Sequence, residues 1–264
     1  MVAVFSTSTE LHIGKGSLAK IVDIIESERV KNVFVVTDKG LQSAGITKRL
    51  YRYLEQANVS YHVFDRVEPD PTEQVVHDAF DELQAFQADM LIAIGGGSSI
   101  DSAKAIGILA TNGGKIGDYR GVGNVKNDIL PLVAIPTTAG TGSEVTAVTV
   151  VIDTDKKLKY SIGGKQLAPK WAIIDPTLTL TVPPRITAYT GIDALTHAIE
   201  AYTSKLSFTL TDAIAKEAIK MIGESLRTAV YRGNDEEARE KMLTASLMAG
   251  VSFSNAKLGL CHVL

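Results

Sequence analysis

Short apolar runs alternate with longer amphipathic runs through the first half of the chain, and this alternation restricts the fold more than any other feature. The apolar runs are rich in β-branched and aromatic residues, which is typical of strands buried in a parallel sheet. Parallel neighbours require a crossover connection, and the intervening runs have the periodicity of helices. We therefore predict a doubly wound α/β sheet. The expected strands are Val33–Thr37, Tyr61–Asp65, Met90–Ile94 and Leu132–Ile135, and the expected helices are Leu41–Gln56, Glu73–Gln87 (capped by Thr72) and Ile100–Ala110.

The pattern changes after Pro136. Three more β-rich segments, 145–153, 158–162 and 171–175, are expected to form a smaller sheet or hairpin attached to the first domain. From Pro183 onward the sequence has helical periodicity only, over 186–203, 211–231 and 236–253. We therefore predict two domains: an α/β domain over residues 1–182 and the start of an all-helical domain over residues 183–264.

The composition excludes several classes of function. The 264 residues are 45% hydrophobic and 22% charged, as in ordinary soluble proteins. A net charge of −3 without a basic run argues against binding to nucleic acid or to a membrane surface. No stretch of about 18 apolar residues is present, and the N-terminus lacks the features of a signal peptide. With the single cysteine, Cys261, these features favour a cytoplasmic protein.

A run of glycines, Gly95 to Gly97, joins the third expected strand to the next helix and is followed by Ser98 and Ser99. Glycines let a backbone approach a ligand closely, and the N–H groups at the start of a helix can point at phosphate oxygens. The pattern favours a site for the pyrophosphate of a cofactor. The alternative is a tight turn in which Ser98 or Ser99 caps the helix. The Gly-x-Gly-x-x-Gly fingerprint of dinucleotide-binding domains is absent.

Two further segments follow strands and are expected to meet the glycine run at one edge of the sheet. Asp38 follows the first strand, where it can accept hydrogen bonds from ribose hydroxyls and repel a 2′-phosphate; the alternative is a turn aspartate. The block Pro136–Glu144 follows the fourth strand and is dense in small residues and hydroxyls. Such a block can hydrogen-bond phosphate or ribose, or it can be a flexible connector. Its position at the end of a strand favours binding.

Asp193 and His197 lie four residues apart in a helical segment, so their side chains share one helix face. A carboxylate and an imidazole can together bind a divalent ion, and such ligands suit Fe(II) or Zn better than Mg or Ca. The alternative is an ordinary surface pair, but apolar neighbours such as Ile192 indicate a buried face. His262 is a third candidate ligand. Glu200 is expected to face solvent or to support the site from behind.

The glycine run with Asp101 and Lys104, the block 136–144 and the segment 191–200 together resemble the iron-containing (group III) alcohol dehydrogenases. The similarity extends over the whole chain and is greatest to the branch of lactaldehyde reductase, 1,3-propanediol dehydrogenase and NAD-dependent methanol dehydrogenase. It implies a Rossmann-like α/β domain that binds NAD(P) and an all-helical domain that binds one metal ion, a dehydroquinate synthase-like architecture.

The resemblance also implies residue roles. Asp38 implies NAD rather than NADP, and the implied metal is Fe(II), with Zn or another divalent ion as alternatives. The metal ligands implied are Asp193, His197 and His262. The cofactor contacts implied are Asp38, Gly96, Gly97, Ser98, Thr137, Thr138, Thr141, Lys159 and Leu178.

The family pattern contains a fourth metal-binding histidine a little over a dozen residues beyond His262, and another histidine near the reacting centre. This sequence stops at Leu264, before the fourth ligand, and has neither histidine, so we expect an incomplete helical domain in a fragment or a truncated product. The activity implied is a metal-dependent, NAD(P)-linked interconversion of a small primary alcohol or diol and its aldehyde, by a homo-oligomer. The alternatives are a glycerol dehydrogenase-like relative and a truncated chain that binds nucleotide without catalysis.

Overall fold

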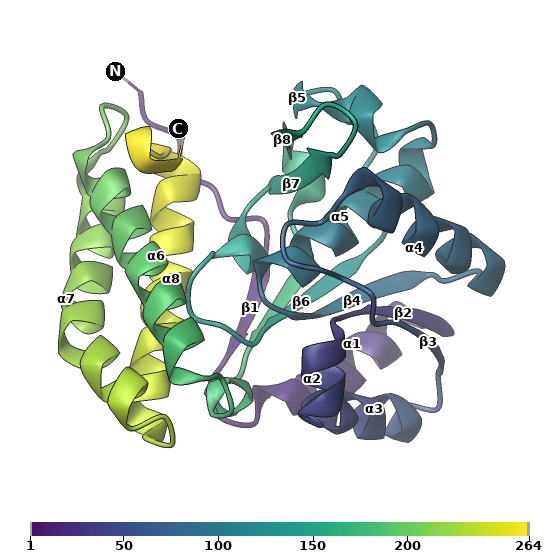
Figure 1. Ribbon diagram of the computed structural model, residues 1–264, viewed down its shortest axis with the longest axis horizontal. Helices are drawn as coiled ribbons and strands as arrows, with labels where there is room; N and C mark the ends of the chain where they lie inside the picture. The colour runs from purple at the N-terminus through teal and green to yellow at the C-terminus, as the bar shows by residue number, and fades with distance from the viewer. Residues whose placement is uncertain (1, 263–264) are drawn as a thin grey trace.

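Six parallel strands form the central sheet of the computed structural model, which describes residues 2–262 (Figure 1). Their order is β1-β9-β6-β4-β2-β3. The division into domains 1–182 and 183–264 stays a prediction, and residues 1, 263 and 264 of these ranges lie outside the described residues. The strands are β1 (Glu10–Ile13), β2 (Asn32–Val36), β3 (Ser60–Phe64), β4 (Met90–Gly95), β6 (Leu132–Pro136) and β9 (Trp171–Ile174).

Alternate side chains of the central strands pack against helices on opposite faces of the sheet. In β2, Val33 and Val35 belong to one buried cluster, whereas Phe34 and Val36 belong to another. The first cluster includes residues of α1 and α3, and the second includes residues of α4 and α5. Figure 1 shows these two pairs of helices on opposite sides of the sheet. The strands are apolar at consecutive positions because both of their faces are buried. The helices are α1 (Lys20–Glu28), α3 (Thr47–Gln56), α4 (Glu73–Phe86) and α5 (Gly97–Asn112).

The four expected strands and the capped helix are confirmed, but one helix is divided. Thr72 is the N-cap of α4, and its hydroxyl accepts the N–H of Val75 at 3.3 Å. The expected helix over 41–56 is wrong, because the chain forms two helices, α2 (Lys39–Ser43) and α3. Between them Gly45 has a φ of +73°, a left-handed conformation that ends a helix.

The segment 171–175 also differs from the expectation. β7 (Val148–Asp153) and β8 (Leu158–Gly163) pair antiparallel, and β5 (Gly121–Val122) joins β8, so the expected smaller sheet exists. However, 171–174 form β9, which lies between β1 and β6 in the central sheet. All four residues of β9 are buried, a pattern typical of a parallel strand covered on both faces.

Residues 184–256 contain three long helices, which pack together beside the sheet (Figure 1). They are α6 (Pro184–Thr203), α7 (Thr209–Tyr231) and α8 (Glu236–Ala256), followed by the 3-10 turn η6 (Leu260–His262). The buried guanidinium of Arg239 in α8 donates to Thr187 Oγ1 at 2.7 Å and to the Val182 carbonyl at 3.0 Å. The predicted combination of a parallel α/β sheet with a helical C-terminal part is therefore confirmed. Among residues 2–262 no helix is long and apolar enough to span a membrane.

Candidate functional site

The glycine run forms the junction between β4 and α5. β4 ends at Gly95 and α5 begins at Gly97, with Gly96 as an extended N-cap; among residues 2–262 no side chain caps the helix. The alternative in which Ser98 or Ser99 caps the helix is wrong, because both serines lie within it. The uncapped N–H groups and the positive end of the helix suit an anionic ligand.

The loop that follows β6 lies directly against this glycine junction. A Cβ atom on Gly97 would lie 2.7 Å from Thr141 Cγ2, and one on Gly96 would lie 3.4 Å from Thr138 Oγ1. The N–H of Thr137 donates to the carbonyl at the end of β4 at 2.9 Å. Five of the residues predicted to contact a cofactor therefore meet at the ends of two neighbouring strands.

The remaining predicted cofactor residues lie in different settings. The hydroxyl of Ser98 accepts the N–H of Asp70 at 3.3 Å, and the Asp70 carboxylate pairs with Lys159 Nζ at 2.6 Å. Lys159 therefore reaches the glycine junction through Asp70. Asp38 follows β2, the sheet neighbour of β4, and its carboxylate caps α2 by accepting a backbone N–H at 2.9 Å. Leu178 has no exposed surface and belongs to the apolar core of the sheet.

Asp193, His197 and His262 come together beside α6, where one possible ligand atom from each lies within 4.8 Å of the other two. His262 approaches from η6, with its Nε2 3.3 Å from Asp193 Oδ1. The two imidazole rings stack with their centroids 4.1 Å apart. His197 is buried, but Asp193 is partly exposed and Ile192 is 53% exposed, contrary to the expected burial of this face. The cluster therefore remains open to solvent on one side.

Glu200 lies behind this cluster and is buried. Its carboxylate accepts the backbone N–H of Cys261 at 2.7 Å, and its other oxygen lies 2.5 Å from Nδ1 of His262. Of the two expectations for Glu200, solvent exposure is wrong. The other expectation, that Glu200 supports the cluster from behind, agrees with its seven-residue spacing from Asp193. This spacing places the two carboxylates only about 20° apart around the helix.

The contacts of His262 fit the binding of a divalent metal ion. The Glu200 carboxylate only accepts, so Nδ1 of His262 carries the hydrogen that is donated to it. In a neutral ring the lone pair of Nε2 then faces the Asp193 carboxylate oxygen, which is also an acceptor. Two acceptors at this distance are unfavourable unless a cation or a proton lies between them. A donor set of one carboxylate and two imidazoles suits Fe(II) or Zn.

The hydrogen-bond partner of His197 also fits the binding of a metal ion. Its Nδ1 lies 3.2 Å from the carbonyl of Gly140, which can only accept, so Nδ1 carries the hydrogen and Nε2 has the free lone pair. Burial lowers the pKa of His197, the Asp193 carboxylate opposes this, and His262 lowers the pKa further. A neutral imidazole is the form that binds metals.

Removing the carboxylate behind His262 is expected to weaken metal binding. In Glu200→Ala, His262 loses the acceptor that fixes its ring, and we expect the affinity for Zn(II) to fall by about 10-fold to 100-fold. Competition with a chromophoric chelator measures this affinity. The control is Glu217→Ala, which removes a carboxylate from the exposed surface of α7. Equal affinities of the Glu200 and Glu217 variants would assign Glu200 no part in the site.

One loop joins the two groups of residues. Thr138 and Thr141 face the glycine junction, while Gly140 between them contacts His197. A Cβ atom on Gly140 would lie 2.6 Å from Thr190 Cβ in α6, so the absence of a side chain allows this close approach. The glycine junction and a cluster of metal-ligand type therefore lie on either side of a single loop.

The chain matches family models over most of its length. The model for iron-containing alcohol dehydrogenase matches residues 8–176, and the C-terminal model of the Fe-containing alcohol dehydrogenase family matches residues 187–264. NAD-dependent methanol dehydrogenase of Bacillus methanolicus is 43% identical over 250 residues, which cover 95% of this chain and 66% of the relative. 1,3-Propanediol dehydrogenase of Klebsiella pneumoniae is 43% identical over 236 residues, which cover 89% of this chain and 61% of the relative.

Solved structures show the same likeness. A 1,3-propanediol oxidoreductase has a TM-score of 0.95 and 39% identity, over 98% of this chain and 68% of that chain. A sulfoacetaldehyde reductase from Bifidobacterium kashiwanohense in complex with NAD⁺ has a TM-score of 0.92 and 35% identity, over 98% of this chain and 68% of that chain. The chain thus spans 66% or less of the length of the two curated relatives. It belongs to the iron-containing alcohol dehydrogenase family.

Proposed function

We propose that the protein is a metal-dependent, NAD-linked alcohol dehydrogenase that interconverts a small primary alcohol or diol and its aldehyde. The observation that supports this most directly is the single loop between the glycine junction and the Asp193, His197 and His262 cluster. A nucleotide and a metal ion bound on the two sides of this loop would be neighbours. The names of the relatives, which include an NAD-dependent methanol dehydrogenase and a 1,3-propanediol dehydrogenase, support the same reaction.

The residues have distinct roles in this proposal. Asp193, His197 and His262 hold Fe(II), or Zn or another divalent ion. The cofactor lies along the glycine junction and the facing loop, near Gly96, Gly97, Ser98, Thr137, Thr138 and Thr141. Asp38 selects NAD by accepting hydrogen bonds from ribose, and its negative charge disfavours the 2′-phosphate of NADP. Lys159 acts through Asp70, whereas the role of the buried Leu178 rests on the family resemblance alone.

The chemistry divides between the bound groups and the chain. When bound, the metal ion supplies a Lewis acid for the alcohol oxygen, and NAD⁺ accepts the hydride to give NADH, aldehyde and a proton. Glu200 and Gly140 hold the two imidazoles with their Nε2 lone pairs free. The glycine junction and its facing loop orient the nucleotide.

We further infer a cytoplasmic homo-oligomer divided near residue 182 into an α/β and a helical domain. The single cysteine supports a reducing compartment. The start of α6 at Pro184 supports the division. Assembly into a homo-oligomer rests on the family resemblance.

Removal and return of the metal tests the proposed function. The protein is treated with a chelator, and alcohol-dependent NADH formation is followed by absorbance with methanol, ethanol, 1-propanol, 1,3-propanediol and glycerol. We expect turnover only after Fe(II) or Zn(II) is restored without oxygen, with short primary alcohols or diols ahead of glycerol. Turnover that is indifferent to the metal, or no NADH from any alcohol, would contradict the proposal. NAD binding without turnover would instead favour a non-catalytic nucleotide-binding chain.

A further inference from the structure

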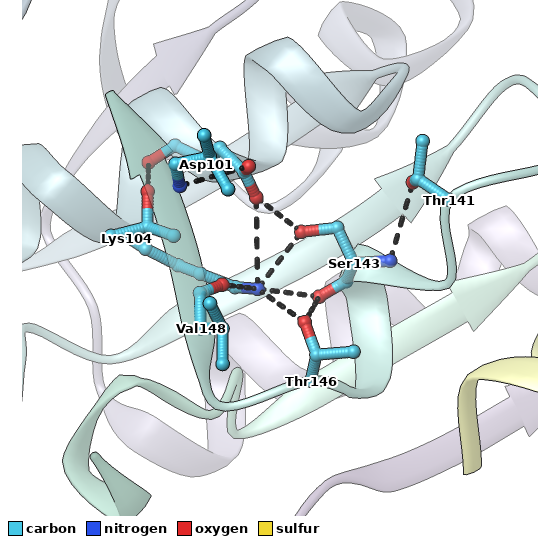
Figure 2. A network of polar contacts seen from close by, with 8 residues as sticks. Asp101, Lys104, Thr141, Ser143, Thr146 and Val148 are labelled. Carbon is cyan, nitrogen blue, oxygen red and sulfur yellow. Dashed lines mark hydrogen bonds and ion pairs between the residues drawn. The ribbon is translucent and has the colours of Figure 1, made fainter. Parts of the chain in front are cut away.

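A buried ammonium group anchors the far end of the loop that serves both halves of the site. Lys104 lies on α5 and has no exposed surface. Figure 2 shows its Nζ surrounded by Ser143, Thr146 and Val148, with Asp101 close by. Nζ donates to the Ser143 carbonyl at 2.7 Å, to Ser143 Oγ at 2.8 Å, to Thr146 Oγ1 at 3.0 Å and to the Val148 carbonyl at 2.8 Å.

The acceptors of Lys104 belong to one continuous segment of chain. An ammonium group has three N–H donors, and four oxygens from residues 143–148 compete for them. The Asp101 carboxylate supplies the balancing charge at 3.9 Å and accepts the hydroxyl of Ser143 at 2.6 Å. A buried charge is costly unless it is paired and hydrogen-bonded, so these contacts hold the segment in one conformation.

The residues just before this segment pack against α8, a neighbour of the helix α6 that carries Asp193 and His197. A Cβ atom on Gly142 would lie 2.7 Å from the Cα of Gly250 in α8. Two residues earlier, the Gly140 carbonyl contacts His197, and Thr141 faces Gly97 at the start of α5. Lys104 projects from that same helix, two turns further on. A short loop thus spans the nucleotide and metal sides of the site and is tied at its end to α5.

We propose that Lys104 is a positioning residue that fixes the loop 137–146, and through it both the nucleotide junction and the orientation of His197. The inference rests on the proposed function. Because one loop contacts both the glycine junction and His197, a small displacement of residues 137–146 is expected to weaken the binding of both the nucleotide and the metal ion. A shift of the loop displaces Thr138 and Thr141 from the glycine junction and takes the Gly140 carbonyl away from Nδ1 of His197.

Two ligand affinities measured on the same protein test this role. NADH binding is followed by fluorescence, and Co(II) binding by titration of its visible absorption, which reports the geometry around the ion. In Lys104→Met we expect both dissociation constants to rise by about tenfold and the Co(II) spectrum to change. The milder variant Thr146→Val removes one acceptor with little change of shape, and we expect a smaller change in the same direction.

The controls separate positioning from general loss of stability. Ser102→Ala alters a buried residue of the same helix whose hydroxyl has no hydrogen-bond partner among residues 2–262, and it is expected to change neither affinity. The double variant Lys104→Met with Thr146→Val is expected to bind no more weakly than Lys104→Met alone, because both act through one contact. Circular dichroism at the assay temperature establishes that each variant is folded.

Each outcome decides between the two proposals. Folded variants with unchanged affinities, or with a change on only one side of the loop, would overturn the role of Lys104 and leave the proposed function intact. If Lys104→Met does not fold, the NADH and Co(II) affinities of Thr146→Val and of the additional variant Ser143→Ala decide the question by the same criteria. If the unaltered protein binds neither NADH nor Co(II), the proposed function fails and the inference fails with it.

Discussion

Replacing His197 by alanine is expected to lower the affinity for Zn(II) or Fe(II) by about a hundredfold or more, and alcohol-dependent NADH formation by about a thousandfold. The variant loses one of three converging ligand atoms and leaves Asp193 and His262 alone. A bound Lewis acid contributes several kcal/mol to the reaction barrier, and each 1.4 kcal/mol or so corresponds to tenfold in rate. Chelator competition measures the first effect, and steady-state kinetics with saturating metal measure the second.

The matched control is His62→Ala. His62 lies on β3, an edge strand of the sheet, and pairs with Glu82; neither residue belongs to the metal-ligand cluster. We expect metal affinity and turnover close to those of the unaltered protein. A His197→Ala variant that keeps both metal affinity and turnover would mean that the metal binds elsewhere.

The pattern of apolar runs predicted most of the fold because it records burial directly. A run such as that of β4 is apolar at consecutive positions only because helices cover both faces of the sheet. The same rule, applied to the run 171–174, would have placed β9 in the central sheet. β1 was missed for the opposite reason: its residues are half-exposed at the edge, and nothing in their alternation distinguishes them from a loop.

Contacts between residues far apart in sequence could not be predicted. The pair Asp193 and His197 follows from helix periodicity, but the contact of His197 with Gly140 joins residues 57 positions apart. The contact of Lys104 with Ser143 joins residues 39 positions apart and depends on how α5 packs beneath the loop. Local spacing specifies which side chains share a helix face, whereas the partners across the fold depend on tertiary packing.

Glu144, next to Ser143 in this loop, is a carboxyl group whose burial is costly. It is 2% exposed, and its Oε1 has no hydrogen-bond partner among the described residues. Burial raises its pKa from the ordinary value of 4.5 to about 7, an effect that its own backbone N–H and the charge of Lys104 only partly oppose. The folded protein therefore retains a proton on Glu144 at pH values where the unfolded chain has released it.

The sign of the resulting pH dependence is fixed. Protonation of Glu144 contributes stability that is fully present below pH 4.5 and is lost as the pH rises through about 7. The shift corresponds to about 3 kcal/mol in the free energy of unfolding. Glu144→Gln has no proton to lose, so its stability relative to the unaltered protein should increase by about this amount over the same interval.

Urea unfolding of both proteins, from about pH 4 to about pH 7.5, measures this difference in the free energy of unfolding. The upper limit lies below the pKa of Lys104, which burial lowers to about 8. The exposed variant Glu217→Gln, in which the carboxylate is replaced on the surface of α7, should show no such trend. A constant difference between Glu144→Gln and the unaltered protein across this range would mean that Glu144 is ionised in the folded state, with its charge balanced by Lys104. Lys104 would then have a second negative charge nearby, in addition to that of Asp101.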